Sequence, residues 1–270
     1  RELDETGPYC LLIPMSLVRV IEDTFFAVCR YWGGLQNAFD VFGPVRAMQT
    51  GIASADLNMA WSEAPLTPED APWVRQVEKY YEGASLPYWW WVFPRAKTAE
   101  TIRLLKETGH VHVMNMPCLL ADLSILPLGE PASKVRRVEH QEDLERWKEV
   151  TFAGFDFPQS ERTSYDRFIG AFFSDPDSPQ KAFLAFDGGK PAAASLLFLA
   201  NDAAGLYFIT TLAEYRRRGI GRELVLATLH HARASGARFA SLQSSPDGRS
   251  VYEKAGFKEF CRVDIYARKG

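Results

Sequence analysis

The residues best suited to chemistry lie in the stretch 214-EYRRRGIGREL-224, between a predicted strand and a predicted helix. Three consecutive arginines precede Gly219 and Gly221, and an apolar helical pattern follows. Because glycine has no Cβ atom, the two glycines allow a tight turn and a close approach to a ligand. Amide N–H groups at a helix start form a concave set of donors, and the helix dipole adds positive potential. These features predict a cradle for phosphate oxygens, with charge-assisted contacts or screening from Arg216, Arg217, Arg218 and Arg222.

The glycine spacing disfavours two common phosphate-binding motifs. It matches neither the dinucleotide pattern GxGxxG nor the P-loop pattern GxxxxGK followed by Ser or Thr. Nucleic-acid binding is also disfavoured, because Glu214 and Glu223 flank the arginines and the net charge of the chain is -3. No aromatic stacking platform accompanies the run. A phosphorylated small molecule therefore suits the stretch better than a nucleic acid.

The composition indicates a globular protein with a proper core. Hydrophobic residues make up 47% of the 270 residues and charged residues 24%, which suits one large or two modest domains. The apolar stretch at residues 10–29 contains Arg19, Glu22 and Asp23, so it predicts an amphipathic soluble helix and no membrane span. The four cysteines show no CxxC spacing, which predicts reduced core residues in a cytoplasmic protein: Cys10, Cys29, Cys118 and Cys261.

A linker is predicted at residues 127–134, where two prolines and a glycine separate two patterned segments. Beyond it, residues 135–270 are predicted to form a mixed α+β domain. The predicted strands cover residues 135–139, 181–186, 191–199, 206–212, 238–242 and 257–267. The predicted helices cover residues 142–155, 160–174 and 219–235, with a short one ending at Gly256.

The N-terminal half, residues 1–126, repeats part of this order. A helix at 68–82, a strand at 87–93, a helix at 98–108 and a strand at 110–114 resemble the order at the end of the chain. The phrases 104-LLKETGHVHV-113 and 251-VYEKAGFKEF-260 each place a helix before a glycine and an alternating strand. We therefore expect two diverged copies of one fold. The alternative is coincidence, because glycine commonly ends helices.

Two motifs resemble those of the GNAT (Gcn5-related) acetyltransferases. Arg216-x-x-Gly219-x-Gly221, after a strand and before a helix, resembles the family element Q/R-x-x-G-x-G/A. The segment 251-VYEKAGF-257 resembles the second hallmark, although Ser245 and Gly248 stand where Asn and Ala are more usual. The resemblance covers residues 135–270 and implies the GNAT fold, a mixed and mostly antiparallel sheet flanked by helices. It also implies a tandem arrangement with a degenerate GNAT-like N-terminal domain.

The resemblance further implies how acetyl-coenzyme A binds. Backbone amides of residues 217–221 would hold its pyrophosphate, and the strand at 209–212 would splay at a β-bulge to pair with the pantetheine arm. An amide N–H near Thr211 or Leu212 would polarise the acetyl carbonyl. No metal is expected. The cofactor-binding residues implied are Ile209, Thr210, Thr211, Leu212, Arg216, Arg217, Arg218, Gly219, Ile220, Gly221, Arg222 and Ser245.

Tyr252 is the catalytic residue that the resemblance implies. A tyrosine at this motif position lies near the coenzyme sulfur and can protonate the leaving thiolate. The alternative is a packing tyrosine beside Phe257. The general base stays open: the predicted strand 206–212 holds no acid, and Asp202 is expected in a turn. Asp156 is either an acceptor contact or a solvated loop acid.

Other chemistry-bearing residues have structural interpretations. His230 and His231 are neighbours on a predicted helix and cannot form a metal pair. His110 and His112 share a predicted strand face, but two histidines without a third ligand indicate a metal only weakly. The tryptophans of 89-WWW-91 should alternate between the two faces of a strand as core residues. Since residues 1–126 lack a cofactor motif, this half should bind no acetyl-coenzyme A and should serve as a scaffold or as a wall of the acceptor pocket.

These features together predict an acetyl-CoA-dependent N-acetyltransferase. The acetyl group would move to a primary amine, on a small molecule or a peptide, by direct attack in a ternary complex. No Ser or Cys nucleophile constellation indicates a covalent intermediate. The alternative is a non-catalytic acyl-CoA-binding or sensor protein, which would keep the phosphate cradle but would not need Tyr252.

Overall fold

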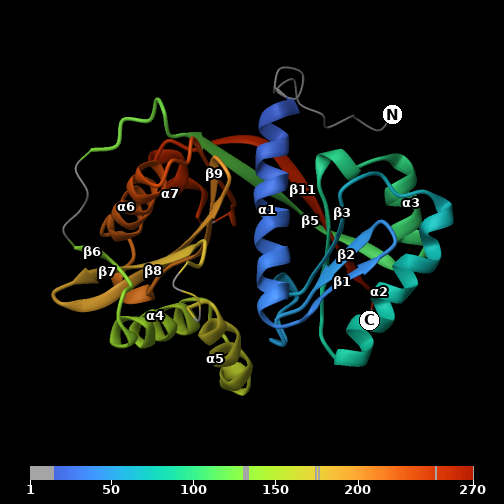
Figure 1. Cartoon of the computed structure of the whole chain (residues 1–270), viewed down its shortest axis with the longest axis horizontal. Helices are drawn as coiled ribbons and strands as arrows, with labels where there is room; N and C mark the ends of the chain where they lie inside the picture. Colours follow the sequence, from blue (N-terminus) through green and yellow to red (C-terminus); the bar gives the residue numbers. More distant parts are fainter. Residues whose placement is uncertain (1–14, 130–133, 174, 176, 247, 270) are drawn as a thin grey trace.

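A computed structural model of the chain describes residues 15–129, 134–173, 175, 177–246 and 248–269. Their strands form one 11-stranded sheet in the order β1-β2-β3-β4-β11-β5-β10-β9-β8-β7-β6 (Figure 1). Only β3–β4 and β9–β10 are parallel among the strand pairs of this part of the chain. The fold is therefore mixed α+β with a mostly antiparallel sheet flanked by helices, as predicted.

The elements of the C-terminal half follow the predicted order, whereas β1, β2 and β3 of the N-terminal half were not predicted. The N-terminal half contains α1 (Met15–Leu35), β1 (Phe39–Phe42), β2 (Val45–Met48), β3 (Met59–Ser62), α2 (Ala71–Ala84), β4 (Trp89–Val92), α3 (Ala99–Glu107) and β5 (His110–Asp122). The C-terminal half contains β6 (Val135–Arg137), α4 (Gln141–Gly154), α5 (Arg162–Ala171), β7 (Gln180–Asp187), β8 (Lys190–Ala200), β9 (Ala203–Thr211), α6 (Ile220–Ala234), β10 (Phe239–Gln243), α7 (Arg249–Lys254) and β11 (Lys258–Arg268).

Several predicted boundaries differ from the structure: for example, β9 begins at Ala203 and not at 206, and α2 begins at Ala71 and not at 68. The helix expected at 160–174 begins only at Arg162, because Gln159–Glu161 form a 3-10 turn after Pro158, and it ends at Ala171. The strand expected at 110–114 continues to Asp122, because its second part pairs with β10. Residues 10–14 of the predicted first helix, Cys10 and part of the predicted linker lie outside the described residues.

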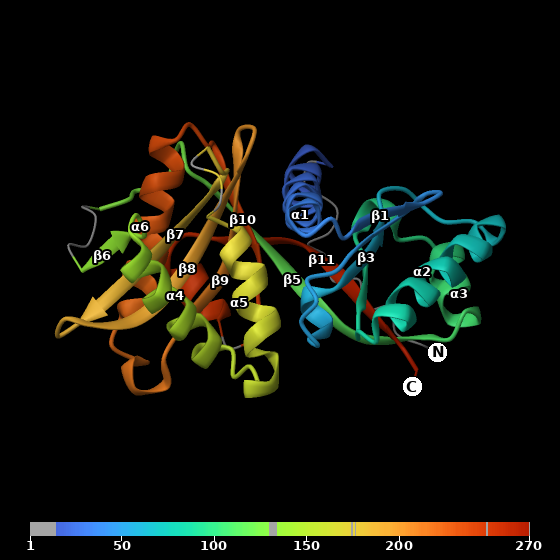
Figure 2. The ribbon, with the colours of Figure 1, turned by 60° about the horizontal axis from the view of Figure 1, so that its bottom comes forward.

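The two halves exchange their last strands. β5 belongs to the N-terminal half, yet its residues Cys118–Asp122 pair antiparallel with β10 of the other half. β11 ends the C-terminal half, yet Asp264–Ala267 pair antiparallel with β4. β5 and β11 also pair with each other along most of their length, from Lys258–Leu120 to Arg268–His110, and Figure 2 shows both strands running from one half to the other. The parallel pairs β3–β4 and β9–β10 thus occupy equivalent places, which supports the expectation of two related halves.

The helices cover the two faces of the sheet differently. One apolar core extends across both halves on the face that α1, α4 and α5 cover. On the opposite face, α6 and α7 cover the C-terminal half, and α2 and α3 cover the N-terminal half, with a separate core under each pair. Trp91 packs in the shared core and Trp90 in the α2–α3 core, so the predicted alternation and burial are confirmed for these two tryptophans. Trp89, only partly buried, packs beside the shared core.

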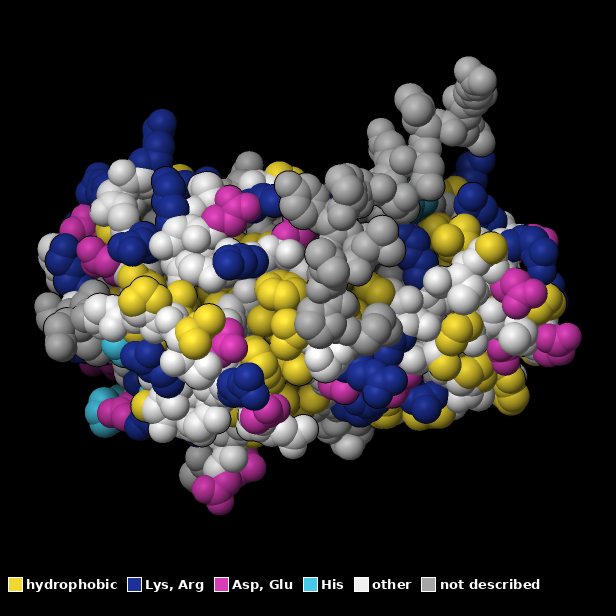
Figure 3. All heavy atoms as spheres, turned by 90° about the horizontal axis from the view of Figure 1, so that it is seen from above, with side chains coloured by type: hydrophobic (Ala, Val, Ile, Leu, Met, Phe, Trp, Pro, Cys, Tyr) yellow, Lys and Arg dark blue, Asp and Glu magenta, His cyan; other side chains and the backbone are white. Residues whose placement is uncertain are grey.

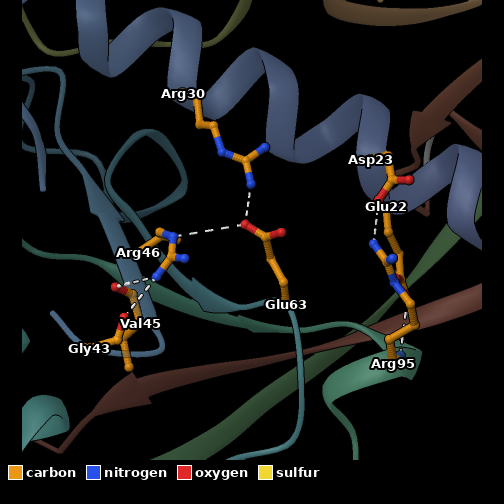
Figure 4. A network of polar contacts seen from close by, with 8 residues as sticks. All are labelled: Glu22, Asp23, Arg30, Gly43, Val45, Arg46, Glu63 and Arg95. Carbon is orange, nitrogen blue, oxygen red and sulfur yellow. Dashed lines mark hydrogen bonds and ion pairs between the residues drawn. The ribbon is translucent and has the colours of Figure 1, made fainter. Parts of the chain in front are cut away.

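α1 is fixed to the N-terminal half by a buried ion pair. The fully buried Glu22 carboxylate accepts hydrogen bonds from the Arg95 side chain and from its backbone N–H at 3.0 Å (Figure 4). Burial raises the pKa of Glu22, and Arg95 partly offsets that rise. Farther along α1, Arg30 pairs with Glu63.

None of the helices in the described ranges combines the length and apolar character needed to cross a membrane.

His110 lies in the α2–α3 core as a neutral side chain. It is 1% exposed, and its Nε2 and Nδ1 atoms lie 2.8 Å from the Tyr88 hydroxyl and 3.2 Å from the Thr108 hydroxyl. Burial lowers the pKa of His110 from 6.5 to about 4. His112, which follows two residues later, is exposed. The two histidines therefore differ in environment and do not form a shared site.

The buried state of His110 predicts a loss of stability in acid. The unfolded chain binds a proton near pH 6.5, but the folded chain does so only near pH 4. The free energy of unfolding should therefore fall by about 3 kcal/mol on this account as the pH drops through that window. His110→Gln should flatten the profile measured by urea unfolding, whereas His112→Gln should not. Equal slopes for both variants would contradict this assignment.

Candidate active site

β9 separates from β10 after three residue pairs. Ala203–Gly205 pair with Phe239–Ser241, and beyond Gly205 no strand of the described chain pairs with this edge of β9. The open edge therefore begins at Leu206, earlier than the predicted 209–212. Leu212 donates its N–H to Ala192 of the β8 side at 2.9 Å, so its amide is not available on the open edge. Since neighbouring residues of a strand direct their N–H groups to opposite sides, the Thr211 amide faces the open edge.

A β-bulge marks the middle of this edge. Phe208 and Ile209 together lie opposite Ser195 of β8, between the pairs Ala194–Thr210 and Leu196–Tyr207. Phe208 has a φ of 48°, a left-handed conformation that non-glycine residues rarely adopt. Trp147 of α4 donates its indole N–H to the Ser195 carbonyl at 3.0 Å, which satisfies a main-chain acceptor beside the bulge.

The stretch predicted to bind phosphate lies directly beyond the end of β9. A 3-10 turn at Ala213–Tyr215 leads to Gly219, whose φ of 82° suits glycine, and α6 then begins. A Cβ atom on Gly221 would lie 3.0 Å from the Thr211 hydroxyl, so the first turn of α6 closely approaches β9. No side chain caps this helix start. The structure thus places the predicted cradle next to the end of the open strand edge.

The arginines mostly contact the protein. Arg216 donates from Nε to the Thr211 carbonyl at 2.9 Å, which ties the loop to the end of β9. Arg218 pairs with Asp187 at 2.9 Å, and Arg222 donates to the Lys254 carbonyl at 3.3 Å. Arg217 is exposed and has a φ of 61°. Figure 3 shows basic and acidic side chains interspersed on the face seen from above, with no broad patch of one sign.

Ser245 precedes the short helix α7, and Tyr252 lies within it. Ser245 is exposed, and its hydroxyl accepts a hydrogen bond from the Gly248 N–H at 3.3 Å in the turn before α7. Tyr252 is 8% exposed and packs edge-on against Phe257, with ring centroids 6.1 Å apart. Burial raises the pKa of Tyr252 to about 12, so the phenol keeps its proton at physiological pH. Tyr252 shares a core with Leu206, the first residue of the open edge.

The other candidates lie elsewhere. Asp156 is exposed in the turn after α4, and Asp202 lies in the β8–β9 turn, at the paired end of β9 rather than the open end. His231 packs against Phe183 with ring centroids 5.3 Å apart, and burial lowers its pKa. Within the residues that the structure describes, no three His, Cys, Asp or Glu side chains gather into a metal-binding group. The described cysteines, Cys29, Cys118 and Cys261, are free thiols.

Sequence reasoning missed the aromatic support of the bulge. The Phe208 ring contacts four aromatic rings at centroid distances of 5.7 to 6.1 Å: Trp32, Trp147, Phe155 and Phe172. Three of them were visible in the sequence as aromatic positions of predicted helices and loops, but nothing linked them to this strand. Trp32 comes from α1, far away in the sequence.

Comparisons with known proteins agree with this geometry. Residues 142–257, less than half of the chain, match the model of the acetyltransferase (GNAT) family. The chain resembles the solved structure of a GCN5-related N-acetyltransferase from Kribbella flavida, with 20% identity, a TM-score of 0.68 and coverage of 92% of this chain and 95% of that chain. No curated protein matches.

Two further structures show the same fold. A GCN5-related N-acetyltransferase from Sphaerobacter thermophilus matches with 14% identity, a TM-score of 0.60 and coverage of 84% of this chain and 78% of that chain. An acetyltransferase of the GNAT family from Colwellia psychrerythraea matches with 16% identity, a TM-score of 0.52 and coverage of 75% and 72%. The chain is therefore an acyltransferase that carries a domain of the acetyltransferase (GNAT) family at residues 142–257.

Proposed function

We propose that the protein transfers an acetyl group from acetyl-coenzyme A to a primary amine by direct attack in a ternary complex. The observation that carries this proposal is the open edge of β9, which ends at the uncapped start of α6. An extended donor with amide groups along its arm and a pyrophosphate at one end suits such a surface, because both parts are bound mainly by backbone groups.

The chemistry follows from the groups on this surface. The amine nitrogen attacks the thioester carbonyl carbon, and the Thr211 N–H lies on the edge where it can stabilise the developing oxyanion. As the carbon–sulfur bond breaks, Tyr252 donates its proton to the thiolate. This proton transfer is uphill, because the pKa of a thiol lies near 8.5 and that of the phenol is higher. Burial raises the pKa of Tyr252 further and so increases the free-energy cost of the transfer in the unliganded protein. The attacking nitrogen loses one proton to water, and the tyrosine regains a proton from water, so that an amide, a free thiol and a neutral tyrosine remain.

The N-terminal half acts, in this proposal, without a cofactor of its own. β3 and β4 have four residues each, and three consecutive pairs, from Met59–Trp89 to Trp61–Trp91, join them. Nearly the whole length of both strands is therefore paired, and this pair has no counterpart of the long open edge of β9. Residues 15–126 then form a scaffold, residues 127–134 the connection and residues 135–269 the catalytic domain. α1 lies against β9 and is the part of this half best placed to border the acceptor site.

Acetyl-coenzyme A binding can be tested with two matched glycine variants. Gly219 and Gly236 flank α6, both have positive φ, and a Cβ on either would meet open space. Each change to alanine should lower the free energy of unfolding by about 1 kcal/mol, because a side chain at positive φ strains the backbone. Only Gly219→Ala should weaken acetyl-coenzyme A binding measured by calorimetry. Equal affinities for the two variants would contradict the cradle.

The acid role of Tyr252 predicts a rate effect with little change in binding. Tyr252→Phe should lower kcat by about 10² to 10⁴ in a screen of small amines, aminoglycosides, amino acids and peptides. Tyr266→Phe, a buried tyrosine on the α2–α3 side of β11, is the control. Because burial raises the pKa of Tyr252 to about 12, the wild-type rate should show no alkaline loss from this phenol at pH values well below 12.

Coenzyme binding without transfer to any acceptor would instead favour a sensor protein.

A further inference from the structure

The left-handed conformation of Phe208 requires support from its surroundings. Phenylalanine at a φ of 48° is strained, by about 1–3 kcal/mol for such residues, and persists only where neighbouring groups hold it. An extended conformation at Phe208 would change the pairing of β9 with β8 at the bulge, three residues beyond Gly205, where β9 separates from β10. The contacts of the Phe208 ring therefore stabilise the bent course of β9 along its open edge.

One of these contacts comes from the half that lacks the cofactor motif. Trp32 of α1 packs against the Phe208 ring at 5.7 Å and against the Tyr207 ring at 5.3 Å, so it contacts two consecutive residues of β9 beside and within the bulge. It also stacks on Phe172 with centroids 5.8 Å apart and planes 10° apart.

Trp32 is itself held in one orientation. Its side chain is 2% exposed, and its indole N–H donates to the Gln180 side-chain oxygen at 2.6 Å. At the other end of α1, the buried pair between Glu22 and Arg95 fixes the helix to the N-terminal half. The position of Trp32 over β9 is therefore set from both halves of the molecule.

We propose that Trp32 is a positioning residue for acetyl transfer, because it holds Phe208 in the conformation that keeps the edge of β9 open. This inference rests on the proposed function, since the open edge is where the donor would bind. It gives the N-terminal half a definite task, which is to maintain the donor site of the other half through one side chain. Trp32 touches no reacting atom in this scheme.

The test compares Trp32→Leu with Trp61→Leu. Trp61 is also buried in the shared core, but it belongs to β3, and its ring packs against Phe26 and Phe39. Both variants lose a large core side chain, so both should lose stability. Only Trp32→Leu should weaken acetyl-coenzyme A binding, by about tenfold, against about twofold or less for Trp61→Leu. Trp32→Phe keeps a ring but loses the hydrogen bond to Gln180, so its loss of acetyl-coenzyme A affinity should be intermediate. If Trp32→Leu does not fold, Trp32→Phe takes its place in the comparison.

A second change separates positioning from general stability. Glycine adopts positive φ without steric cost, so Phe208→Gly should restore most of the affinity of Trp32→Leu while lowering stability further. A purely structural role for Trp32 would give the opposite result, with both affinity and stability falling in the double variant. That outcome would overturn the proposal.

Crystal structures of the unliganded variants provide a measurement that does not depend on activity. Phe208 should leave the left-handed region in Trp32→Leu and keep it in Trp61→Leu, with faster amide exchange over residues 206–212 only in the former. An unchanged φ at Phe208 would overturn the inference. If the wild-type protein binds no acetyl-coenzyme A, the proposed function fails, and the conformation of Phe208 still decides whether Trp32 holds the bulge.

Discussion

The pairing of β5 with β11 is the interaction on which the rest of the molecule depends. Each strand starts in one half and ends beside a strand of the other, so neither half possesses its full set of antiparallel neighbours alone. A buried strand that loses its neighbour leaves backbone N–H and C=O groups without partners, which is costly in free energy. Because of the exchange, each half needs a strand of the other half to satisfy these groups. The shared core under α1 follows from it, because a continuous sheet presents one continuous apolar face.

This dependence places the proposed donor site at the boundary between the halves. The cradle and the open edge of β9 belong to the C-terminal half, but the side chains that hold the bulge come from α1 as well as from α4 and α5. Main-chain groups provide the surface itself. The side chains of the motif stabilise its shape, as the bond from Arg216 to the Thr211 carbonyl illustrates.

Much of the fold could be predicted because its determinants are local. Gly219 and Gly221 mark a turn and a helix start by backbone geometry alone, and the helix-glycine joint at Gly256 locates the last strand. The exchange of β5 and β11 could not be predicted, because strand partners are chosen by packing between residues far apart in sequence. The same holds for Trp32: its sequence neighbours give no indication of contact with Phe208. The choice between the Thr211 and Leu212 amides could not be made from the sequence either, since only the register with β8 shows that the Leu212 amide already has a partner.

The continuous sheet also has a mechanical consequence. Many enzymes made of two lobes close over their substrates by turning about a flexible connection. Here two strands, rather than a single connecting segment, cross from lobe to lobe within one hydrogen-bonded ladder. A rotation of one lobe against the other would shear that ladder. We therefore expect the two lobes to keep a fixed relative orientation, and substrates to enter and leave through movements of loops and side chains.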